Sequence, residues 1–545
     1  MLKREHLRPY QEFIVGKIVQ SVRPGPEKLP GLMVAFEPGG GKTVSVLTGF
    51  DDALNEGLIR KALIVAPLLV AQTVWPEEPQ EWEHLQHLRP LLIRVEDNDP
   101  EVLARSLPVY HEALTRFRNE TATWFTFGLS PQDFAGLLRL LKISPEQRAA
   151  RTRDAAEISI RDELMGRLVA DPAPIHVINR EALPWLWDYA RRKKTWPYDV
   201  MAIDDCREGR TAKTRVKRDK EKQEKAPLSR WGIMAHARKH MKAVIQLTGT
   251  PTPKGLHNMW GLIYLIDLGK RLGTAKTPFY ERYFAMNEYF QPTDPKEGAF
   301  KAIMSKVTDI MFSLRPEDLP DLPDFIIDPI RVKLNDKVLK EYRRFERTLV
   351  SEEYDVEAAN GGVAHGKKLQ FANGSMFRED GKDVWIHDAK IEALKELVER
   401  LDGTPLLVTY DFEFDKERIM RAFKDAVLLT PTNSMQFTRD WNADKIRVGL
   451  CHRASAGHGL NLQKGTGHMC EYGLTTDAEL YLQFKKRLHR PGRKTTVFNH
   501  VIISEGTIDE DVFPMYLDPK IETQERVLEH VRIDLRDPDL VDLLS

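Results

Sequence analysis

Two adjacent aspartates, Asp204 and Asp205, follow the apolar run "VMAI" and precede a segment rich in lysine and arginine. A nucleoside triphosphatase needs one carboxylate near Mg²⁺ and a second carboxylate that orients the attacking water. Both must stand at the carboxyl end of a strand, where ligands bind in α/β sheets. The pair therefore predicts Asp204 on the metal side and Asp205 as the general base. A polar turn or a helix cap is the alternative interpretation.

A glycine-rich turn lies upstream, in "GLMVAFEPGGGKTVSVL". A strand, a turn and a helix start in this order let backbone N–H groups surround phosphate oxygens. Lys42 would then reach the β- and γ-phosphates, and Thr43 would supply a hydroxyl group to Mg²⁺. The strict phosphate-loop pattern has glycine at the position of Phe36, so a flexible turn without a nucleotide stays open.

A basic segment near the C-terminus, "QFKKRLHRPGR", has a helical pattern. Arg487 and Arg490 are about one helical turn apart, so both side chains can point at one γ-phosphate, as arginine fingers do. A solvated cationic helix face is the alternative. In "HLRPYQ", the side-chain amide of Gln11 offers the hydrogen-bonding pattern that pairs with adenine.

The elements that must position these residues are short apolar runs that alternate with helical patterns in both halves of the chain. Such runs predict buried parallel strands, and two series of them predict two α/β domains. The first predicted domain (1–272) contains a helical insertion (about 97–168) and a basic loop (about 207–229). A helical insertion and linker (273–324) follows it. The second predicted domain (325–545) contains a loop insertion (about 351–385) and a C-terminal helical tail.

The composition places limits on the class of protein. Lys+Arg and Asp+Glu both number 81 in 545 residues, so any basic surface must be local. The charged run from Arg207 to Lys225 is either a DNA contact or a solvated loop. No signal peptide and no apolar run of about 18 residues is present, which predicts a soluble protein that is not exported and not in a membrane.

The cysteines and three histidines are predicted to be structural. The cysteine spacing fits neither a disulfide framework nor a metal knuckle, which suits a reducing cytoplasm. The residues concerned are Cys206, Cys451 and Cys470, and His452, His458 and His489.

Together, these segments resemble a superfamily 2 ATPase, and more closely the Swi/Snf-type branch found in bacteriophage genomes. The resemblance covers nearly the whole chain and is carried in order by "LRPYQ", "EPGGGKT", "ALIVAPLLVAQTVW", "VINREALPWL", "IDDCREGR", "LTGTPTPKGLHNMWGLIYLID", "SAGHGLNLQ" and "YLQFKKRLHRPGR". It implies two RecA-like P-loop NTPase domains with ATP and Mg²⁺ in the cleft between them.

The resemblance also implies roles for individual residues. Gln11 would read adenine, Asp204 and Asp205 would take the Walker B roles, and Arg487 and Arg490 would complete the γ-phosphate site. The phosphates and Mg²⁺ would be held by Pro38, Gly39, Gly40, Gly41, Lys42 and Thr43. The second domain would line the cleft with Gly457, Gly459, Asn461 and Gln483. Coupling to DNA would involve Thr248, Thr250, Pro67 and the loop around Thr409 and Tyr410.

The chain departs from this family at three places. The family carries glutamate where this chain has Asp205, and aspartate is one methylene shorter, so slower turnover is expected. Arg493 stands where glutamine is usual, and the insertion at about 97–168 is longer than in phage relatives.

The sequence therefore predicts an ATP-dependent translocase on double-stranded DNA, with forked or single-stranded DNA as further substrates. A strand-separating DNA or RNA helicase is one alternative. A weakly hydrolysing or non-hydrolysing adaptor that binds ATP and DNA is another, because Asp205 replaces glutamate. We further expect a monomer in the bacterial host cytoplasm, working with phage replication or recombination proteins.

Overall fold

The computed structural model describes most of the chain. The described residues are 1–96, 99–108, 111–112, 145–205, 227–314, 322–430, 432–453, 462–490 and 492–533, with the backbone alone for 145–152. Most of the predicted basic loop (207–226), the inner part of the 97–168 insertion, Cys206 and His458 lie outside these residues.

A seven-stranded parallel sheet forms the centre of the first lobe, in the order β3-β4-β2-β5-β6-β1-β9. Its strands are β1 (Gly31–Ala35), β2 (Ala62–Ala66), β3 (Leu91–Leu92), β4 (Ile175–Asn179), β5 (Val200–Asp204), β6 (Ala243–Leu247) and β9 (Met311–Ser313). The sequence favours this arrangement because its runs of valine, isoleucine and leucine can be buried on both faces. Strand β6 separates β1, which leads into the glycine-rich turn, from β5, which ends at Asp204.

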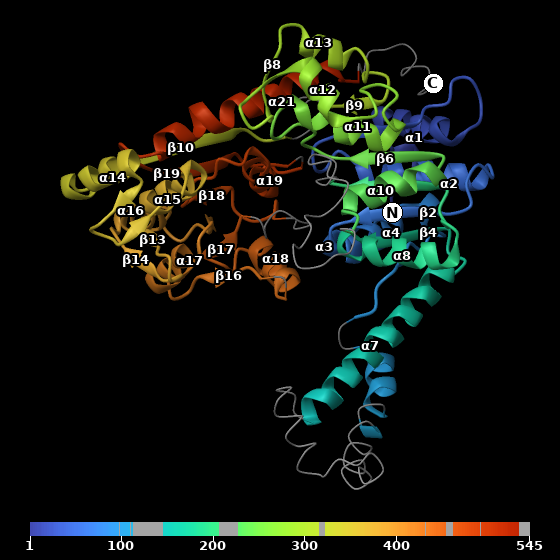
Figure 1. Ribbon diagram of the computed structural model, residues 1–545, viewed down its shortest axis with the longest axis horizontal. Helices are drawn as coiled ribbons and strands as arrows, with labels where there is room; N and C mark the ends of the chain where they lie inside the picture. The colour runs from blue at the N-terminus through green and yellow to red at the C-terminus, as the bar shows by residue number, and fades with distance from the viewer. Residues whose placement is uncertain are drawn as a thin grey trace, which may run out of the picture.

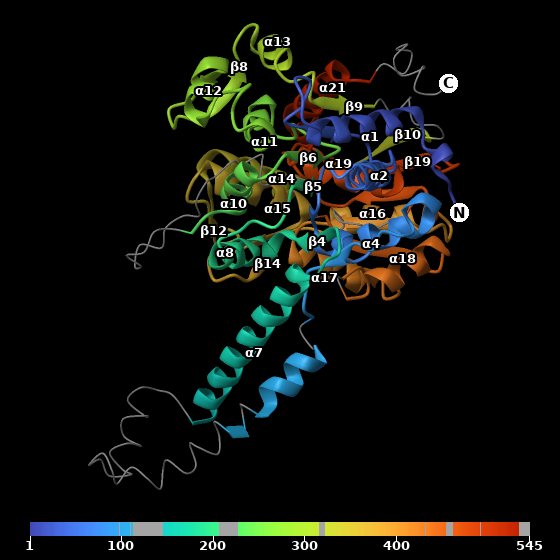
Figure 2. The same cartoon turned by 90° about the vertical axis from the view of Figure 1, so that its right-hand side faces the viewer.

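Helices cover both faces of the first sheet (Figures 1 and 2). One face packs on α1 (Pro9–Val22), α2 (Lys42–Asn55) and α4 (Val74–Glu81). The other face packs on α8 (Leu183–Lys193), α10 (Arg230–Ala237), α11 (Met259–Asp267), α12 (Lys276–Tyr283) and α13 (Ala299–Met304). Neighbouring strand residues such as Met33 and Val34 enter opposite cores, as the alternation of side chains along a strand requires.

A six-stranded parallel sheet forms the centre of the second lobe, in the order β10-β19-β18-β15-β17-β16. Its strands are β10 (Phe325–Val332), β15 (Leu406–Tyr410), β16 (Val427–Leu428), β17 (Val448–His452), β18 (His468–Glu471) and β19 (Val497–Ser504). Helices α16 (Ala389–Arg400) and α17 (Glu413–Ala422) pack on one face, and α18 (Ser434–Asn442) and α19 (Ala478–Leu488) on the other. Two parallel sheets with flanking helices confirm the predicted fold class of two RecA-like α/β domains.

The remaining elements connect or decorate the two lobes. In the first they are η1 (Arg4–His6), α3 (Leu68–Gln72), η2 (Glu83–Leu85), α7 (Pro145–Ala170), η4 (Arg180–Ala182), η5 (Arg238–His240), η6 (Leu256–Asn258), β7 (Phe284–Met286) and β8 (Pro292–Pro295). In the second they are α14 (Asp336–Thr348), β11 (Val350–Ser351), β12 (Val356–Glu357), α15 (Gly361–Asn373), β13 (Ser375–Phe377), β14 (Asp383–Trp385), α20 (Asp509–Asp511), the π-helix η8 (Val512–Leu517) and α21 (Asp518–His530).

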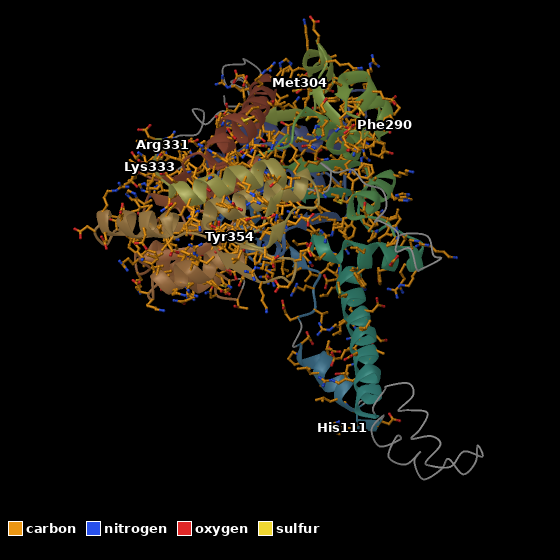
Figure 3. All side chains as sticks on the ribbon, turned by 60° about the vertical axis from the view of Figure 1, so that its left-hand side comes forward. His111, Phe290, Met304, Arg331, Lys333 and Tyr354 are labelled. Atoms are coloured by element: carbon orange, nitrogen blue, oxygen red, sulfur yellow. The ribbon has the colours of Figure 1, made fainter. Side chains whose placement is uncertain are left out.

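The predicted 97–168 insertion contributes an arm that projects from the first lobe. Helix α7 runs away from the sheets in both views (Figures 1 and 2), beside a helical segment at 100–108. Arg105 and Glu163 pair across the two helices at 2.6 Å, and His111 lies at the far end of the arm (Figure 3). The arm places a long polar surface well away from the lobes.

The region predicted as a loop insertion, 351–385, is largely regular structure, so that prediction is wrong. Asn360 caps α15 by accepting a hydrogen bond from Val363 N at 3.0 Å, and Gly374 ends the helix with φ +102°. Glycine and asparagine, which suggest a loop by composition, serve as helix caps here. Phe371 and Met376 then anchor a small hydrophobic core.

Two segments cross the predicted domain boundaries. Strand β9, predicted within the linker, completes the first sheet by pairing Met311 with Met33 of β1. Helix α21, in the predicted C-terminal tail, packs on the first lobe, where Ser313 N donates to Val531 O at 2.9 Å. Val527 and Val531 belong to a core of the first lobe. No helix in the described part of the chain is long and apolar enough to span a membrane.

Candidate active site between the two lobes

The phosphate loop, residues 36–41, joins β1 to α2. Gly41 is the N-cap of α2 and has φ +74°, a conformation that favours glycine. A Cβ atom at Gly41 would lie 1.7 Å from Nε2 of Gln11, so the loop is packed against that side chain. The Gln11 Oε1 atom accepts a hydrogen bond from Arg8 N at 2.7 Å and thereby caps α1. Gln11 is thus placed at the loop, and its role toward adenine stays a prediction.

Lys42 begins α2 and folds back over the phosphate loop. Its Nζ donates to the carbonyl oxygens of Phe36 at 2.8 Å and Glu37 at 3.1 Å. Burial lowers the pKa of Lys42 to about 8, against the opposing effect of the Asp204 and Glu37 carboxylates. The ammonium group therefore occupies the cradle that a phosphate would fill, and carbonyl oxygens hold it there. Thr43 follows in the first turn of α2.

Asp204 and Asp205 stand at the carboxyl end of β5. Burial raises the pKa of Asp204, while the Lys42 cation opposes that shift and Trp75 Nε1 donates to its Oδ2 at 3.2 Å. Asp205 has φ +51°, a left-handed conformation that aspartate tolerates better than most residues. Arg180 binds the pair, through Asp204 O at 3.2 Å and Asp205 Oδ2 at 3.3 Å. The aspartates are thus held in different environments.

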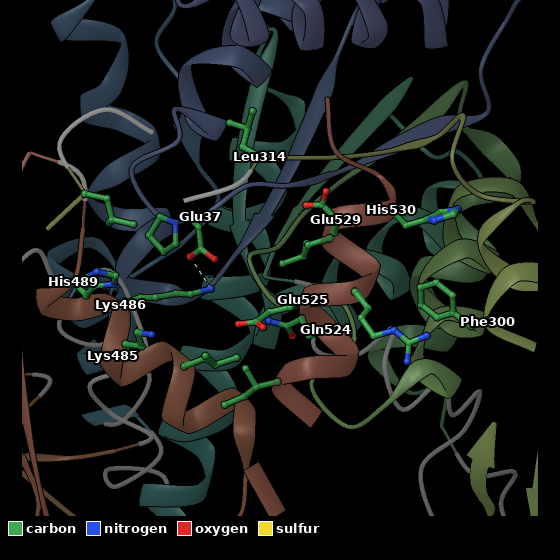
Figure 4. Close-up of a pocket in the computed structure, with 16 residues that line it drawn as sticks. Glu37, Phe300, Leu314, Lys485, Lys486, His489, Gln524, Glu525, Glu529 and His530 are labelled. Atoms are coloured by element: carbon green, nitrogen blue, oxygen red, sulfur yellow. Dashed lines mark ion pairs between the residues drawn. The ribbon is translucent and has the colours of Figure 1, made fainter. Parts of the chain in front are cut away.

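Helix α19 brings cations from the second lobe to the phosphate loop. Lys486 Nζ pairs with Glu37 Oε2 at 2.7 Å and donates to Gly249 O at 3.1 Å (Figure 4). Arg490 Nε donates to Lys486 O at 2.5 Å, and burial lowers the Arg490 pKa to about 10. These contacts fix the end of α19 against the first lobe.

One cavity of about 220 Å³ unites most of the predicted side chains. Residues from both lobes line it: Pro38, Lys42, Pro67, Val70, Val74, Asp204, Asp205, Leu247, Thr248, Gly249, Thr250, Gln483, Lys486, Arg487 and Arg490. The strand register explains part of this convergence, since Asp204 pairs with Leu247 and so lies beside Thr248. Thr250 N donates to Thr248 Oγ1 at 3.0 Å, which holds the turn after β6. A second cavity of about 850 Å³ shares Pro38 and Lys486 with it and extends along α21 (Figure 4).

Some predicted residues fall elsewhere. Gly457, Gly459 and Asn461 lie outside the described residues. The prediction that Thr409 and Tyr410 belong to a DNA-facing loop is wrong: both belong to β15 and are 0% and 7% exposed. The strand continues two residues beyond its apolar run, and the Thr409 hydroxyl donates to Cys470 O at 3.3 Å.

The predicted structural residues have ordinary surroundings. Cys451 and Cys470 are buried, and burial raises the pKa of the Cys451 thiol to about 12. The His489 ring contacts Pro323 O at 2.8 Å, and the His452 ring packs edge-on against Tyr410. Arg493 turns away from the cleft and donates to the carbonyl oxygens of Gln463 and Gly465.

Sequence reasoning missed Glu37, Trp75, Arg180 and Lys486. All four residues stand inside segments that carry the resemblance, namely "EPGGGKT", "ALIVAPLLVAQTVW", "VINREALPWL" and "YLQFKKRLHRPGR", so their place in these segments was the available signal. Nothing in the local sequence around Trp75 or Glu37 indicates a partner 129 or 449 residues away.

The donor set suits a magnesium polyphosphate. Lys42 and the N-terminus of α2 can bind phosphate oxygens, and Asp204 with Thr43 offers the oxygen ligands that Mg²⁺ prefers. Among the described residues, no group of three or more His, Cys, Asp or Glu side chains could hold a metal ion on its own. Mg²⁺ bound here would complete its coordination with phosphate oxygens and water.

Comparisons with known proteins give one relative of similar length. The chain is 29% identical over 519 residues to protein p41 of Acyrthosiphon pisum secondary endosymbiont phage 1, covering 93% of this chain and 94% of that protein. No family model matches the chain.

Among solved structures, the chain is similar to the Sulfolobus solfataricus SWI2/SNF2 ATPase core in complex with dsDNA. The TM-score is 0.36 at 16% identity, and the alignment covers 96% of this chain and 97% of that chain. The SWI2/SNF2 ATPase core domain of the same organism gives a TM-score of 0.36 at 16% identity, with 96% and 90% covered. Likeness at this TM-score does not assign a function.

Proposed function

We propose that this protein is an ATPase that hydrolyses ATP between its two lobes and uses the energy to move on double-stranded DNA. The observation that carries the ATPase part is the single cavity in which Lys42, Asp204 and Asp205 face Arg487 and Arg490 of the other lobe. A γ-phosphate between these groups would meet cations from both lobes, so hydrolysis could change how the lobes are held together.

In this proposal each group has a defined task. Lys42 leaves its carbonyl partners to bind the β- and γ-phosphates, and Arg487 and Arg490 stabilise the charge that develops on the transferred group. Asp204 and Thr43 would hold Mg²⁺, which would supply positive charge to the phosphate oxygens. Asp205 orients the attacking water and accepts its proton.

The DNA part of the proposal rests on the order of the sequence segments that resemble Swi/Snf-type ATPases. Thr248, Thr250 and Pro67 line the cavity near the ends of β6 and β2. In this proposal they pass changes at the phosphates to a DNA-facing surface. Since its relative p41 is a phage protein, we place this protein in an infected bacterial cytoplasm, where replication or recombination proteins are candidate partners.

One contact favours a second candidate, an ATP- and DNA-binding adaptor that hydrolyses weakly or not at all. The Arg180 guanidinium lies 3.3 Å from Asp205 Oδ2, and a neighbouring cation makes a carboxylate a poorer base. A strand-separating helicase is the remaining alternative.

ATP hydrolysis measured with duplex, forked and single-stranded DNA and with RNA tests these proposals. We expect duplex DNA to stimulate hydrolysis most, without strand separation on a tailed duplex. No stimulation by duplex DNA would contradict the translocase, and no turnover with intact ATP binding would favour the adaptor.

A further inference from the structure

A cationic pocket lies at the opposite edge of the first sheet from the cleft. It has a volume of about 490 Å³ and is formed by residues that precede β1, residues that precede β6 and the turn after α11. Strand β1 begins at Gly31 and is five residues long, so this edge stands roughly 17 Å from the phosphate loop, at about 3.3 Å per residue. We call it the reverse-edge pocket, lined by Lys28, Arg238, Lys242, Asp267, Lys270 and Arg271 among others.

The one carboxylate that lines the pocket is already used. Asp267 is 2% exposed, accepts hydrogen bonds from Gly269 N at 2.8 Å and Arg271 N at 2.9 Å, and pairs with the Arg271 guanidinium at 3.3 Å. Arg271 also pairs with Asp309 at 2.5 Å. The two carboxylates, Asp267 and Asp309, therefore offset Arg271 and the nearby Arg238, and they leave the three lysines of the pocket without a counter-charge.

Arg238 supplies a buried positive charge beneath the pocket. It is 8% exposed, and its guanidinium donates to three main-chain oxygens, of Pro30 at 2.8 Å, Met241 at 2.8 Å and Ile266 at 2.9 Å. Carbonyl oxygens satisfy its hydrogen bonds but do not cancel its charge. The Arg238 side chain is thus held in a fixed position at the pocket, where its positive charge would attract an anion.

Three lysines stand exposed at the rim, Lys28, Lys242 and Lys270. Among the described residues, no carboxylate lies within ion-pair distance of any of them, and Lys242 Nζ donates to Leu58 O at 2.5 Å. Burial and the neighbouring cations Arg238, Lys242 and Lys270 lower the pKa of Lys28. The lysines therefore repel one another in this structure.

Such a cluster is unusual in a chain whose acidic and basic residues balance at 81 each. Acids that would relieve the repulsion are plentiful elsewhere, as in the paired charges along α7. An anion in the pocket would relieve it instead, and a phosphate group matches several lysine donors around a fixed arginine.

We propose that the reverse-edge pocket binds phosphate groups, and that the backbone of a nucleic acid is the favoured source. Exposed lysines at the rim can reach phosphates on an extended polymer, and phosphate contacts do not depend on its sequence. The pocket then forms a second nucleic-acid contact, separate from the cleft and independent of nucleotide.

The test compares two double variants that change the net charge equally. Lys28→Gln/Lys270→Gln alters the rim, and Lys301→Gln/Lys306→Gln removes two exposed lysines elsewhere on the first lobe. Duplex DNA binding is measured by fluorescence anisotropy over a range of salt concentrations. We expect the rim variant to bind several-fold more weakly, with the slope of log K against log salt smaller by about 1 for each phosphate that it no longer binds. The control should keep the wild-type slope.

A melting experiment with inorganic phosphate distinguishes a pocket that binds free phosphate from one that binds the phosphates of a nucleic-acid backbone. If phosphate raises the melting temperature of the wild type and the control but not of the rim variant, while DNA binding is equal in all three, the pocket takes a free phosphate. Equal behaviour of all three proteins in both assays, or an equal weakening of DNA binding in the two double variants, overturns the proposal. Hydrolysis of ATP is assayed in parallel, so failure of the ATPase proposal would be seen separately.

Discussion

Cations outnumber carboxylates at both edges of the first sheet, by four to two in the cleft at the carboxyl edge and by five to one in the reverse-edge pocket at the amino edge. Glu37 pairs with Lys486 and Asp204 lies near Lys42 in the cleft, but Lys28 and Lys270 have no such partner among the described residues. Binding phosphate together with Mg²⁺ requires carboxylates, while binding phosphate alone requires only cations. The ratio of cations to carboxylates thus distinguishes the two edges more clearly than pocket volume does.

Removal of the central charges in the cleft should have the largest effect. Lys42→Ala and Asp204→Ala should each lower ATP hydrolysis at least about 100-fold, because each removes a preorganised charge at the phosphates. The measurement is phosphate release at saturating ATP and duplex DNA. Lys301→Ala, on exposed α13, is the matched control for loss of a lysine. Hydrolysis that persists in both cleft variants would show that the reaction occurs elsewhere.

The ion pair between Glu37 and Lys486 joins the two lobes, and removing it tests whether this contact supports hydrolysis. Lys486→Ala should lower hydrolysis about ten- to hundredfold, since α19 and its arginines would lose their register on the phosphate loop. The exchange Glu37→Lys/Lys486→Glu should recover part of the rate. Lys485→Ala is the control, because Lys485 Nζ lies over the Phe325 ring at 4.1 Å and does not pair with Glu37. A rate equal to the wild type in Lys486→Ala would remove the pair from the mechanism.

A smaller effect is expected at Asp205, which stands where the Swi/Snf-type ATPases that the sequence resembles carry glutamate. Asp205→Glu should keep hydrolysis within a few-fold of the wild type or raise it, because the longer side chain moves the carboxylate toward the water. The left-handed φ of Asp205 opposes this, since glutamate adopts it less readily than aspartate. Steady-state rates and thermal melts separate the two effects. A clear loss of rate without loss of stability would mean that the site is built around aspartate.

A buried carboxylate that lies in neither pocket shows what burial does to a carboxyl group. Asp415 in the second lobe is fully buried, and burial raises its pKa to about 7, with Asn373 Nδ2 donating to it at 2.9 Å. Because the folded-state pKa lies above the ordinary value of 3.8, folding retains a proton between these pH values, and stability is lost as pH rises through about 7.

Asp415→Asn should remove that decline, with a gain of up to about 4 kcal/mol above pH 7 relative to the wild type, because each pH unit between 3.8 and about 7 is worth about 1.4 kcal/mol. Urea unfolding at pH 5, 7 and 8.5 measures it. Parallel pH profiles of wild type and variant would show that Asp415 keeps its charge when buried.

Much of the cleft could be predicted from local sequence. The phosphate loop and the Asp204 strand end are local patterns, and chain order was enough to relate them to Arg487 and Arg490. The boundaries were less predictable. Asn360 and Gly374 indicated a loop by composition but cap a helix, and the apolar run before Thr409 did not indicate where β15 ends.

Hydrophobic periodicity and turn chemistry act over a few neighbouring residues, so they were enough to predict the two parallel sheets and the residue types at the ends of their strands. Which distant charges meet depends on how the chain packs. Lys486 reaches Glu37, Arg180 reaches Asp205, and Arg238 comes to lie beneath Lys28, since parallel strands joined by long connections bring together residues that no local pattern relates.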